Sequence, residues 1–381
     1  MARPLRVAID LRPLALPSGG GIGLLVSQIV EELSLRGISF LGITDQPVPS
    51  GRIPENLPTW IVSGGGGRIR WESLALPGLL RGLDPAPDLF HATWNHGVPR
   101  GLPFPSLLSL HDLIPWRAPR LIPWPRPALL HRALYRRAVR GSARAAARIV
   151  TLSEASRRDI EAAIPEASGR IEVVPCAVPR WFQTPLPPAV AALHARFGGP
   201  YWLYVGGFDP RKDVETLIDA LGALHARGVN VPPTVLAGTR GGHAQRLEAR
   251  AAQLSPKVLF PGYVPDVELS TLYGGASLFI YPSRAEGFGI PPLLAMAAGV
   301  PVVAADGGAV PEVLGGAGIV VPAGDVPALA AALEAALADP TSLAANRARG
   351  RARALEFTVD ALASRMREAY ERAATRPGGS R

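Results

Sequence analysis

Cysteine and long apolar runs are scarce in this 381-residue chain, and each shortage excludes a class of protein. The one cysteine, Cys176, has no partner for an internal disulfide and fits a reducing compartment. No window approaches the ~18 consecutive apolar residues of a membrane-spanning helix. A strand-like run at 5–9 follows Met1 so closely that we expect no signal peptide. The sequence therefore predicts a cytoplasmic protein without a membrane span.

Acidic residues are absent between Asp112 and Glu154, a segment that holds nine arginines. Acidic and basic residues balance elsewhere, so this segment carries the whole net charge of +9. Two tryptophans, Trp116 and Trp124, precede a predicted helix of about 20 residues whose leucines and alanines form an apolar side. Arginines recur on that helix at every fourth position: Arg132, Arg136, Arg140, Arg144 and Arg148.

This arginine ridge predicts a reversible contact with an anionic membrane surface, because basic amphipathic helices with nearby tryptophan bind such surfaces. The protein would then be peripheral on the inner face of the membrane. The alternative is a solvated face in an arginine-rich protein. We expect no nucleic acid partner, because the segment carries no motif that reads bases.

Short apolar runs separated by helix-length amphipathic stretches predict parallel sheets covered on both faces. The expected strands of the first half are Val7–Asp10, Phe40–Thr44, Asp88–Thr93, Ser106–His111, Ile149–Ser153 and Ile171–Cys176. Those of the second half are Tyr201–Gly206, Thr234–Gly238, Val258–Gly262, Leu278–Pro282, Val302–Ala305 and Ile319–Pro322. Two such series predict two doubly wound α/β domains, with ligands bound at the carboxyl ends of the strands.

The domain boundary is expected in the proline-rich stretch 179–188. We therefore predict an N-terminal Rossmann-like domain at 1–180 and a C-terminal one at 181–358. A final amphipathic helix at 359–373 is expected to pack back towards the N-terminal domain, followed by a frayed tail at 374–381.

Several enzyme classes are excluded by their missing motifs. The glycines at 19–23 lack dinucleotide-binding spacing, neither lysine lies in a P-loop, and the sequence has no Gly-x-Ser-x-Gly elbow or His-Glu-x-x-His pair. The histidines and the cysteine make no zinc-ligand cluster, and no Asp-x-Asp pair is present. Dehydrogenase, P-loop NTPase, serine hydrolase and zinc hydrolase are therefore disfavoured, and we expect neither a metal nor a cofactor.

Two segments suit a diphosphate. The glycine loop 19–23 lies between the first strand and a helix expected at Leu24–Leu35, where free backbone amides form an anion site. Arg211 and Lys212 follow the strand 201–206 and stand just before a helix, so that a forked donor and a point charge lie side by side. Only two of the 40 basic residues are lysines, which makes a lysine here unusual. The alternatives without a function are an ordinary strand-to-helix turn at 19–23 and a solvent-exposed pair of cations at Arg211 and Lys212.

A third segment places a carboxylate, Glu286, after a strand and before glycines and a helix. With it the chain resembles family 4 of the retaining glycosyltransferases, which have the GT-B fold of two Rossmann-like domains facing a central cleft. The motifs run in family order over nearly the whole chain: 20–23, His111–Pro115, Thr151–Ser156, Pro210–Lys212, Gly262–Asp266, Glu286–Gly289 and Val310–Val313.

The resemblance implies a role for each matching position. Amides of Gly21 and Gly23 would face the donor diphosphate, which Arg211 and Lys212 would clamp near Gly207. Glu286 would accept hydrogen bonds from the transferred sugar, and His111 would lie near its anomeric centre or outer hydroxyl. Asp112 more simply orients its own loop. The remaining implied donor contacts are Tyr263 and Val264 around the base and Gly287, Phe288, Gly289 and Ile290 around the sugar.

One position departs from the family pattern. Members carry a second carboxylate eight residues after the first, where it binds the nucleotide's ribose, and this chain has Leu294 there. A weakened donor site is the direct expectation. The alternative is that Leu294 packs in the core and Asp306 or Glu312 reaches the ribose.

The implied reaction is a metal-independent, retaining transfer of a hexose from a nucleotide diphosphate sugar to a sugar or lipid-linked acceptor in cell-surface polysaccharide synthesis. The His-Asp-Leu-Ile-Pro segment at 111–115 resembles bacterial mannosyl- and rhamnosyl-type transferases, which favours GDP-mannose over a UDP-sugar. A degenerate GT-B scaffold and a UDP-sugar 2-epimerase are the alternatives.

Overall fold

The structure is a computed structural model that describes residues 3–16, 20–62, 71–182, 187–239, 242–254 and 257–375. It forms two compact units. The first comprises Met1–Trp116, Trp124–Ala177 and Val359–Arg381, and the second comprises Arg117–Pro123 and Val178–Thr358. The division falls at 177/178 instead of 180/181, and the amide of Val178 donates to the carbonyl of Phe357 in the second unit. Of the expected frayed tail, 376–381 lies outside the described residues.

The first unit contains a seven-stranded parallel sheet in the order β3-β2-β1-β4-β5-β6-β7. Its strands are β1 (Arg6–Asp10), β2 (Ser39–Thr44), β3 (Thr59–Ile61), β4 (Leu89–Ala92), β5 (Ser106–Ser109), β6 (Arg148–Thr151) and β7 (Ile171–Val173). All expected strands of this half are present, and β3 was not predicted. Its three residues are half-buried or exposed and make no apolar run.

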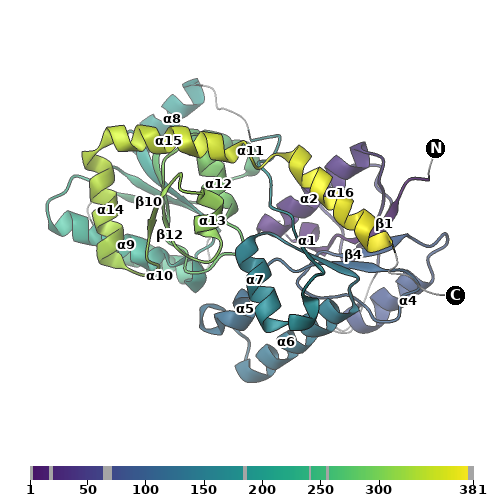
Figure 1. The fold of residues 1–381 in the computed structure, drawn as a ribbon. Coiled ribbons are helices and arrows are strands. Elements are labelled where there is room, and N and C mark those ends of the chain that lie inside the picture. The colour runs from purple at the N-terminus through teal and green to yellow at the C-terminus, as the bar shows by residue number, and fades with distance from the viewer. Residues whose placement is uncertain are drawn as a thin grey trace. The chain divides into compact units, whose positions relative to one another are not determined.

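Helices cover both faces of this sheet (Figure 1). They are α1 (Arg12–Ala15), α2 (Gly20–Leu35), η1 (Trp71–Ala75), α4 (Leu76–Arg81), α5 (Ile114–Arg117), α6 (Ala128–Ala145), α7 (Glu154–Ala163), η3 (Pro165–Ala167) and α16 (Val359–Ala374). The short turn η2 (Pro119–Leu121) lies in the segment Arg117–Pro123, which belongs to the second unit. The last helix lies beside α2 and packs on β4, β5 and β6, whereas α4 and α6 lie on the opposite face.

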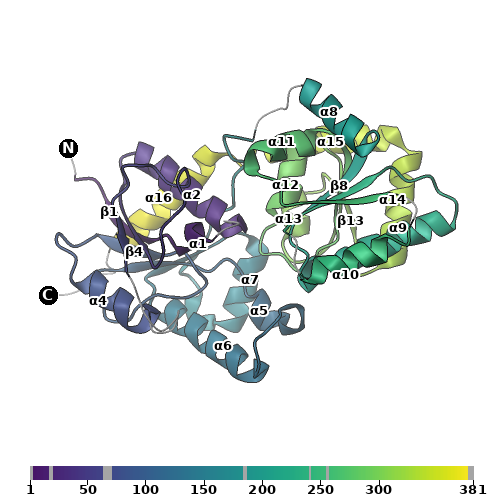
Figure 2. The ribbon, with the colours of Figure 1, turned by 180° about the vertical axis from the view of Figure 1, so that it is seen from behind.

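The second unit contains a six-stranded parallel sheet in the order β10-β9-β8-β11-β12-β13. Its strands are β8 (Tyr201–Val205), β9 (Thr234–Ala237), β10 (Val258–Gly262), β11 (Ala276–Tyr281), β12 (Val302–Ala305) and β13 (Ile319–Val321), which matches every strand expected in this half. The helices are α8 (Pro187–Phe197), η4 (Pro210–Lys212), α9 (Val214–Ala226), α10 (Gly242–Ala251), α11 (Asp266–Gly274), α12 (Ile290–Ala297), α13 (Val310–Leu314), α14 (Val326–Ala338) and α15 (Pro340–Ala354). Figure 2 shows α9 and α10 on one face of this sheet and α11 and α12 on the other.

Each sheet has one point where the strand order reverses, between β1 and β4 in the first unit and between β8 and β11 in the second. Parallel α/β sheets bind ligands outside the carboxyl ends of the strands at such points. Two buried clusters of charged side chains lie at these positions.

The C-terminal helix is tied to the first sheet by a buried polar chain. The hydroxyl of Tyr370 lies 2.9 Å from Nδ1 of His91, and Nε2 of His91 lies 2.8 Å from the hydroxyl of Ser109. Burial, together with the nearby His111, lowers the pKa of His91 to about 3, so the ring is neutral and each nitrogen has one partner.

Tyr370→Phe should lower the free energy of unfolding by about 1–3 kcal/mol, because it leaves a buried ring nitrogen without a hydrogen-bond partner. Tyr273→Phe is the matched control, since the buried Tyr273 hydroxyl has no hydrogen-bond partner among the described residues and its removal should be neutral or stabilising. Urea unfolding of both variants measures the difference. Equal destabilisation by the two substitutions would contradict this account.

Candidate active site

A buried ion cluster occupies the reversal point of the second sheet. Arg211 and Lys212 belong to η4, which follows β8, and Glu286 lies in the loop after β11. Nζ of Lys212 is 2.7 Å from Oε1 of Glu286, and Nη1 of Arg211 is 2.9 Å from Oε2. Glu286 is 74 residues after Lys212 in the sequence, and the adjacency of β8 and β11 brings it to the two cations.

Two further side chains complete the coordination of Glu286. Tyr281 and Ser283 donate hydroxyl hydrogen bonds to Oε1, at 2.9 and 2.5 Å, and Nζ of Lys212 also donates to the Tyr281 oxygen at 2.6 Å. Burial raises the pKa of Glu286, but the charges of Lys212 and Arg211 outweigh it and bring the pKa to about 2. Glu286 is therefore an ionised carboxylate whose less crowded oxygen is Oε2.

Burial also shifts the pKa values of Lys212 and Tyr281. Burial lowers the pKa of Lys212, and the adjacent Glu286 opposes that shift. Burial and the charge of Glu286 raise the pKa of Tyr281 well above its usual range, so its hydroxyl stays protonated and remains a donor. Neither Tyr281 nor Ser283 was predicted, although both lie within five residues of Glu286 in the sequence.

Glycines let a third loop pack against the loop that carries Glu286. A Cβ at Gly307 would lie 2.0 Å from the carbonyl oxygen of Ser283, and one at Gly308 would lie 2.4 Å from that of Glu286. The amide of Ala309 donates to the Glu286 carbonyl at 3.0 Å. This close approach fixes the backbone of Glu286.

The segment after Glu286 enters α12. Gly289 is the helix N-cap with a φ of 110°, a conformation that favours glycine, and Phe288 is buried with its ring edge against Phe357. Gly287 precedes them, and Ile290 is the first residue of the helix. Leu294 lies one turn further and is only 4% exposed.

The other predicted donor contacts of this unit lie outside the ion cluster. Gly207 is in the loop after β8, where its carbonyl accepts a 2.5 Å hydrogen bond from the Tyr204 hydroxyl. Tyr263 and Val264 follow β10, the edge strand two places from β8, and Tyr263 is 52% exposed. Their role at a nucleotide base stays a prediction.

His111 lies just after β5 in the first unit and is buried. Its Nε2 is 2.8 Å from the carbonyl oxygen of Thr93, so Nε2 carries the proton. Burial lowers its pKa to about 4, against the raising effect of that hydrogen bond. Nδ1 of this neutral ring is therefore a hydrogen-bond acceptor, and it is buried without a partner among the described residues.

The glycine loop differs from the prediction. The helix expected at Leu24–Leu35 begins at Gly20, so Gly21 and Gly23 lie in the first turn of α2. Close packing explains why position 23 of this helix is a glycine, because a Cβ there would lie 3.2 Å from the carbonyl oxygen of Pro13. Gly19 lies outside the described residues.

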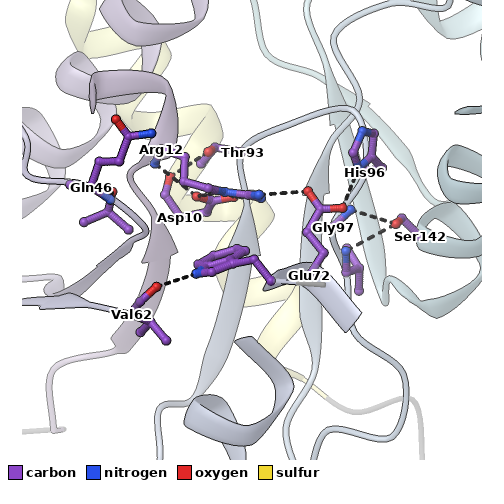
Figure 3. A network of polar contacts seen from close by, with 12 residues as sticks. Asp10, Arg12, Gln46, Val62, Glu72, Thr93, His96, Gly97 and Ser142 are labelled. Atoms are coloured by element: carbon purple, nitrogen blue, oxygen red, sulfur yellow. Dashed lines mark hydrogen bonds and ion pairs between the residues drawn. The ribbon is translucent and has the colours of Figure 1, made fainter. Parts of the chain in front are cut away.

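A second ion cluster, not predicted, lies at the reversal point of the first sheet (Figure 3). Arg12, just after β1, pairs with Asp10 at 2.6 Å and with Oε1 of Glu72 at 2.8 Å. Oε2 of Glu72 is 3.0 Å from Nδ1 of His96, which follows β4. The carboxylates of Asp10 and Glu72 raise the pKa of Arg12 although its burial opposes them.

The predicted arginine helix is shorter than expected. It ends at Ala145, and Arg148 begins β6, where it donates to the carbonyl of Gly169. Arg148 is therefore not part of the ridge. A cavity of about 620 Å³ runs along α6 and is lined by Arg100, Trp116, Leu129, Arg132, Ala133, Arg136, Arg137, Arg140, Gly141 and Arg144. We call these residues the arginine groove.

The arginines of the groove differ in the contacts they already make within the protein. The guanidinium carbons of Arg136 and Arg140 lie 5.4 and 5.3 Å from the ring centre of Trp116, and Arg144 pairs with Glu166 at 2.8 Å. In the described part of the chain, Arg132 and Arg137 make no ion pair. The first two turns of α6 carry three exposed leucines: Leu129, which lines the groove, and Leu130 and Leu134, which stand beside it.

Comparisons with known proteins agree with this architecture. Residues 19–180 match the family model described as Glycosyltransferase Family 4, and residues 199–339 match Glycosyl transferases group 1. The O-antigen chain mannosyltransferase B of Escherichia coli is 31% identical over 273 residues, 70% of each chain. This chain belongs to glycosyltransferase family 4. A GDP-mannose-dependent alpha-(1-6)-phosphatidylinositol monomannoside mannosyltransferase of Mycolicibacterium smegmatis is 35% identical over half of this chain, and the match spans about half of that protein.

Solved structures establish the fold of this glycosyltransferase. Sucrose-phosphate synthase from Thermosynechococcus elongatus superposes with a TM-score of 0.79 at 21% identity, covering 96% of this chain and 98% of the other. Anabaena HepE in complex with UDP and glucose gives 0.75 at 19% identity, covering 96% and 99%. Each unit is thus a Rossmann-like domain of the GT-B fold.

The described residues include no group of three or more histidine, cysteine, aspartate or glutamate side chains that could hold a metal ion. No described helix has the length and hydropathy needed to cross a membrane.

The family resemblance implies a ribose-binding carboxylate at position 294, and from it we expect Leu294→Glu to tighten nucleotide binding by about tenfold. The same change should lower the melting temperature without ligand, because it buries a charge. Calorimetry with the nucleotide measures affinity, and Leu294→Met, which conserves volume, is the control. Unchanged affinity in Leu294→Glu would contradict a ribose role for this position.

Proposed function

We propose that this glycosyltransferase is a retaining, metal-independent mannosyltransferase that moves mannose from GDP-mannose to a sugar or lipid-linked acceptor of cell-surface polysaccharide synthesis. The observation that carries the proposal is the buried cluster of Arg211, Lys212 and Glu286 at the reversal point of the second sheet. It combines two cations for a diphosphate with a fixed carboxylate for a sugar hydroxyl.

The proposed transfer takes place on one face of the sugar. The bond between the anomeric carbon and the diphosphate oxygen breaks, and the acceptor oxygen bonds to that carbon on the same side. The acceptor proton passes to the departing diphosphate oxygen, whose growing charge Arg211 and Lys212 stabilise. Glu286 holds the sugar through its less crowded oxygen, Oε2.

The names of the relatives support mannose and GDP. One relative is an O-antigen chain mannosyltransferase, and another is described as GDP-mannose-dependent. Anabaena HepE binds UDP, which keeps a UDP-sugar as the second candidate donor.

A thermal-shift panel of GDP, GDP-mannose, UDP and UDP-glucose tests the donor, and we expect a saturable shift with GDP and GDP-mannose.

Lys212→Ala should lower turnover by about 10²–10³, the usual loss when one charge-stabilising donor is removed. The other lysine, Lys257, is exposed, and Lys257→Ala is the matched control. Full turnover of Lys212→Ala at saturating donor refutes the charge-stabilising role. Absence of any nucleotide-induced shift would favour a degenerate scaffold.

We further propose that the enzyme is cytoplasmic and attaches to an anionic membrane through the arginine groove. Most arginines of the groove lie on α6, Trp116 of α5 lies against two of them, and exposed leucines stand on the first turns of α6. Each basic residue near an anionic surface contributes about 1 kcal/mol, and exposed leucines add apolar contact. A membrane surface would bring a lipid-linked acceptor to the enzyme.

Co-sedimentation with vesicles at low salt tests the attachment. The protein should bind phosphatidylglycerol vesicles and not phosphatidylcholine vesicles. Arg132→Glu/Arg137→Glu should reduce binding by at least tenfold. Arg246→Glu/Arg347→Glu changes the net charge equally on exposed helices of the second unit and should bind like the wild type. Equal binding to both vesicle types, or equal loss in both variants, would refute the attachment.

A further inference from the structure

The cluster at the reversal point of the first sheet has no role in the transfer described above. Glu72 is its centre, because its two oxygens face different partners: Oε1 faces Nη1 of Arg12, and Oε2 faces Nδ1 of His96 (Figure 3). The carboxylates of Asp10 and Glu72 share one guanidinium, so the three ionised groups together are negative when His96 is neutral.

The hydrogen bonds determine the tautomer of His96. Glu72 is ion-paired with Arg12 and can only accept, so Nδ1 of His96 carries a proton and donates to Oε2. In the neutral ring the other nitrogen, Nε2, is then a lone-pair acceptor. Within the described residues Nε2 has no hydrogen-bond partner, and the side chain is 13% exposed, so a ligand can reach it.

Packing holds this arrangement in one geometry. The guanidinium of Arg12 lies 4.1 Å above the ring centre of the buried Trp71. Gly97 has a φ of 104°, and a Cβ there would lie 3.2 Å from Nη2 of Arg12. The Ser142 hydroxyl accepts from the amide of Gly97 at 3.0 Å, which fixes the backbone next to His96.

We propose that Nε2 of His96 accepts a hydrogen bond from a hydroxyl of a neutral sugar acceptor, with Glu72 as the positioning residue. A lone-pair acceptor beside excess negative charge favours a neutral hydroxyl donor over a phosphate. The inference deepens the proposed function and rests on it. It assigns acceptor recognition to a side-chain pair outside the diphosphate cluster.

The amide variant of Glu72 gives a specific prediction. In Glu72→Gln the amide oxygen must face Arg12, because Arg12 can only donate. The amide NH₂ then faces Nδ1 of His96, which must accept, and the proton moves to Nε2. The variant keeps the shape of the site and converts Nε2 from an acceptor to a donor, as happens when the orienting aspartate of a serine protease triad becomes asparagine.

The test uses GDP-mannose as the donor and methyl α-D-mannopyranoside as the acceptor probe. His96→Ala and Glu72→Gln should each lower kcat/KM for the mannoside by about 10-fold to 100-fold, as for loss of one enzyme–hydroxyl hydrogen bond. Hydrolysis of GDP-mannose without acceptor should stay within about twofold of wild type. NMR of ¹⁵N-histidine-labelled protein should show His96 protonated at Nδ1 in the wild type and at Nε2 in Glu72→Gln. Glu161→Gln, on α7, is the matched control and should change none of these.

Each contrary outcome is distinct. Acceptor recognition by His96 is overturned if kcat/KM for the mannoside is unchanged in both variants. It is also overturned if hydrolysis of GDP-mannose falls as much as kcat/KM for the mannoside. Nε2 protonation in the wild type overturns the positioning role of Glu72. Donor hydrolysis without transfer to any neutral methyl glycoside also overturns the inference. A wild-type protein that neither binds nor hydrolyses a nucleotide sugar refutes the proposed function instead.

Discussion

The second unit is organised around one buried carboxylate. Glu286 can remain ionised inside the protein because Lys212, Arg211, Tyr281 and Ser283 all donate to it. A buried charge that loses one partner is strongly destabilising, so these partners constrain one another. The loops after β8 and β11 are consequently fixed together, and the amide of Arg284 donates to the carbonyl of Arg211. Arg211 and Lys212, the proposed diphosphate ligands, are thus held in place by the protein's own contacts.

The first unit also has a buried ion cluster at the reversal point of its sheet, but with a different balance of charges. Both clusters lie where the strand order reverses, and both contain residues that follow two adjacent central strands; in the first unit Glu72 of η1 joins them. In the second unit two cations surround one carboxylate, whereas in the first two carboxylates share Arg12. The same position in two similar sheets thus offers positive charge in one unit and hydrogen-bond acceptors in the other, which suits a donor diphosphate and an acceptor hydroxyl respectively.

The expected strands were confirmed because a parallel sheet covered on both faces needs continuous apolar runs, and these are visible in the sequence. The errors occur where tertiary packing overrides local preference. Glycines disfavour helix interiors, yet Gly20 and Gly23 belong to α2. The period of four in the arginines continues to Arg148, although the chain has left the helix at Ala146 and entered β6. Periodicity alone could not mark that end, because alanine and arginine suit a helix equally well on either side of it.

The candidate site was predictable to the extent that its residues follow central strands. Lys212 and Glu286 stand in recognisable motifs, and Tyr281 lies at the end of β11 itself. Asp10, at the end of β1, and His96, shortly after β4, meet the same criterion, so attention to both reversal points would have found them. Glu72 is different: it lies on η1, 60 residues from Arg12, in no motif and next to no strand. Glu72 matters because the fold places it between Arg12 and His96, and a single sequence does not show that these three residues are in contact.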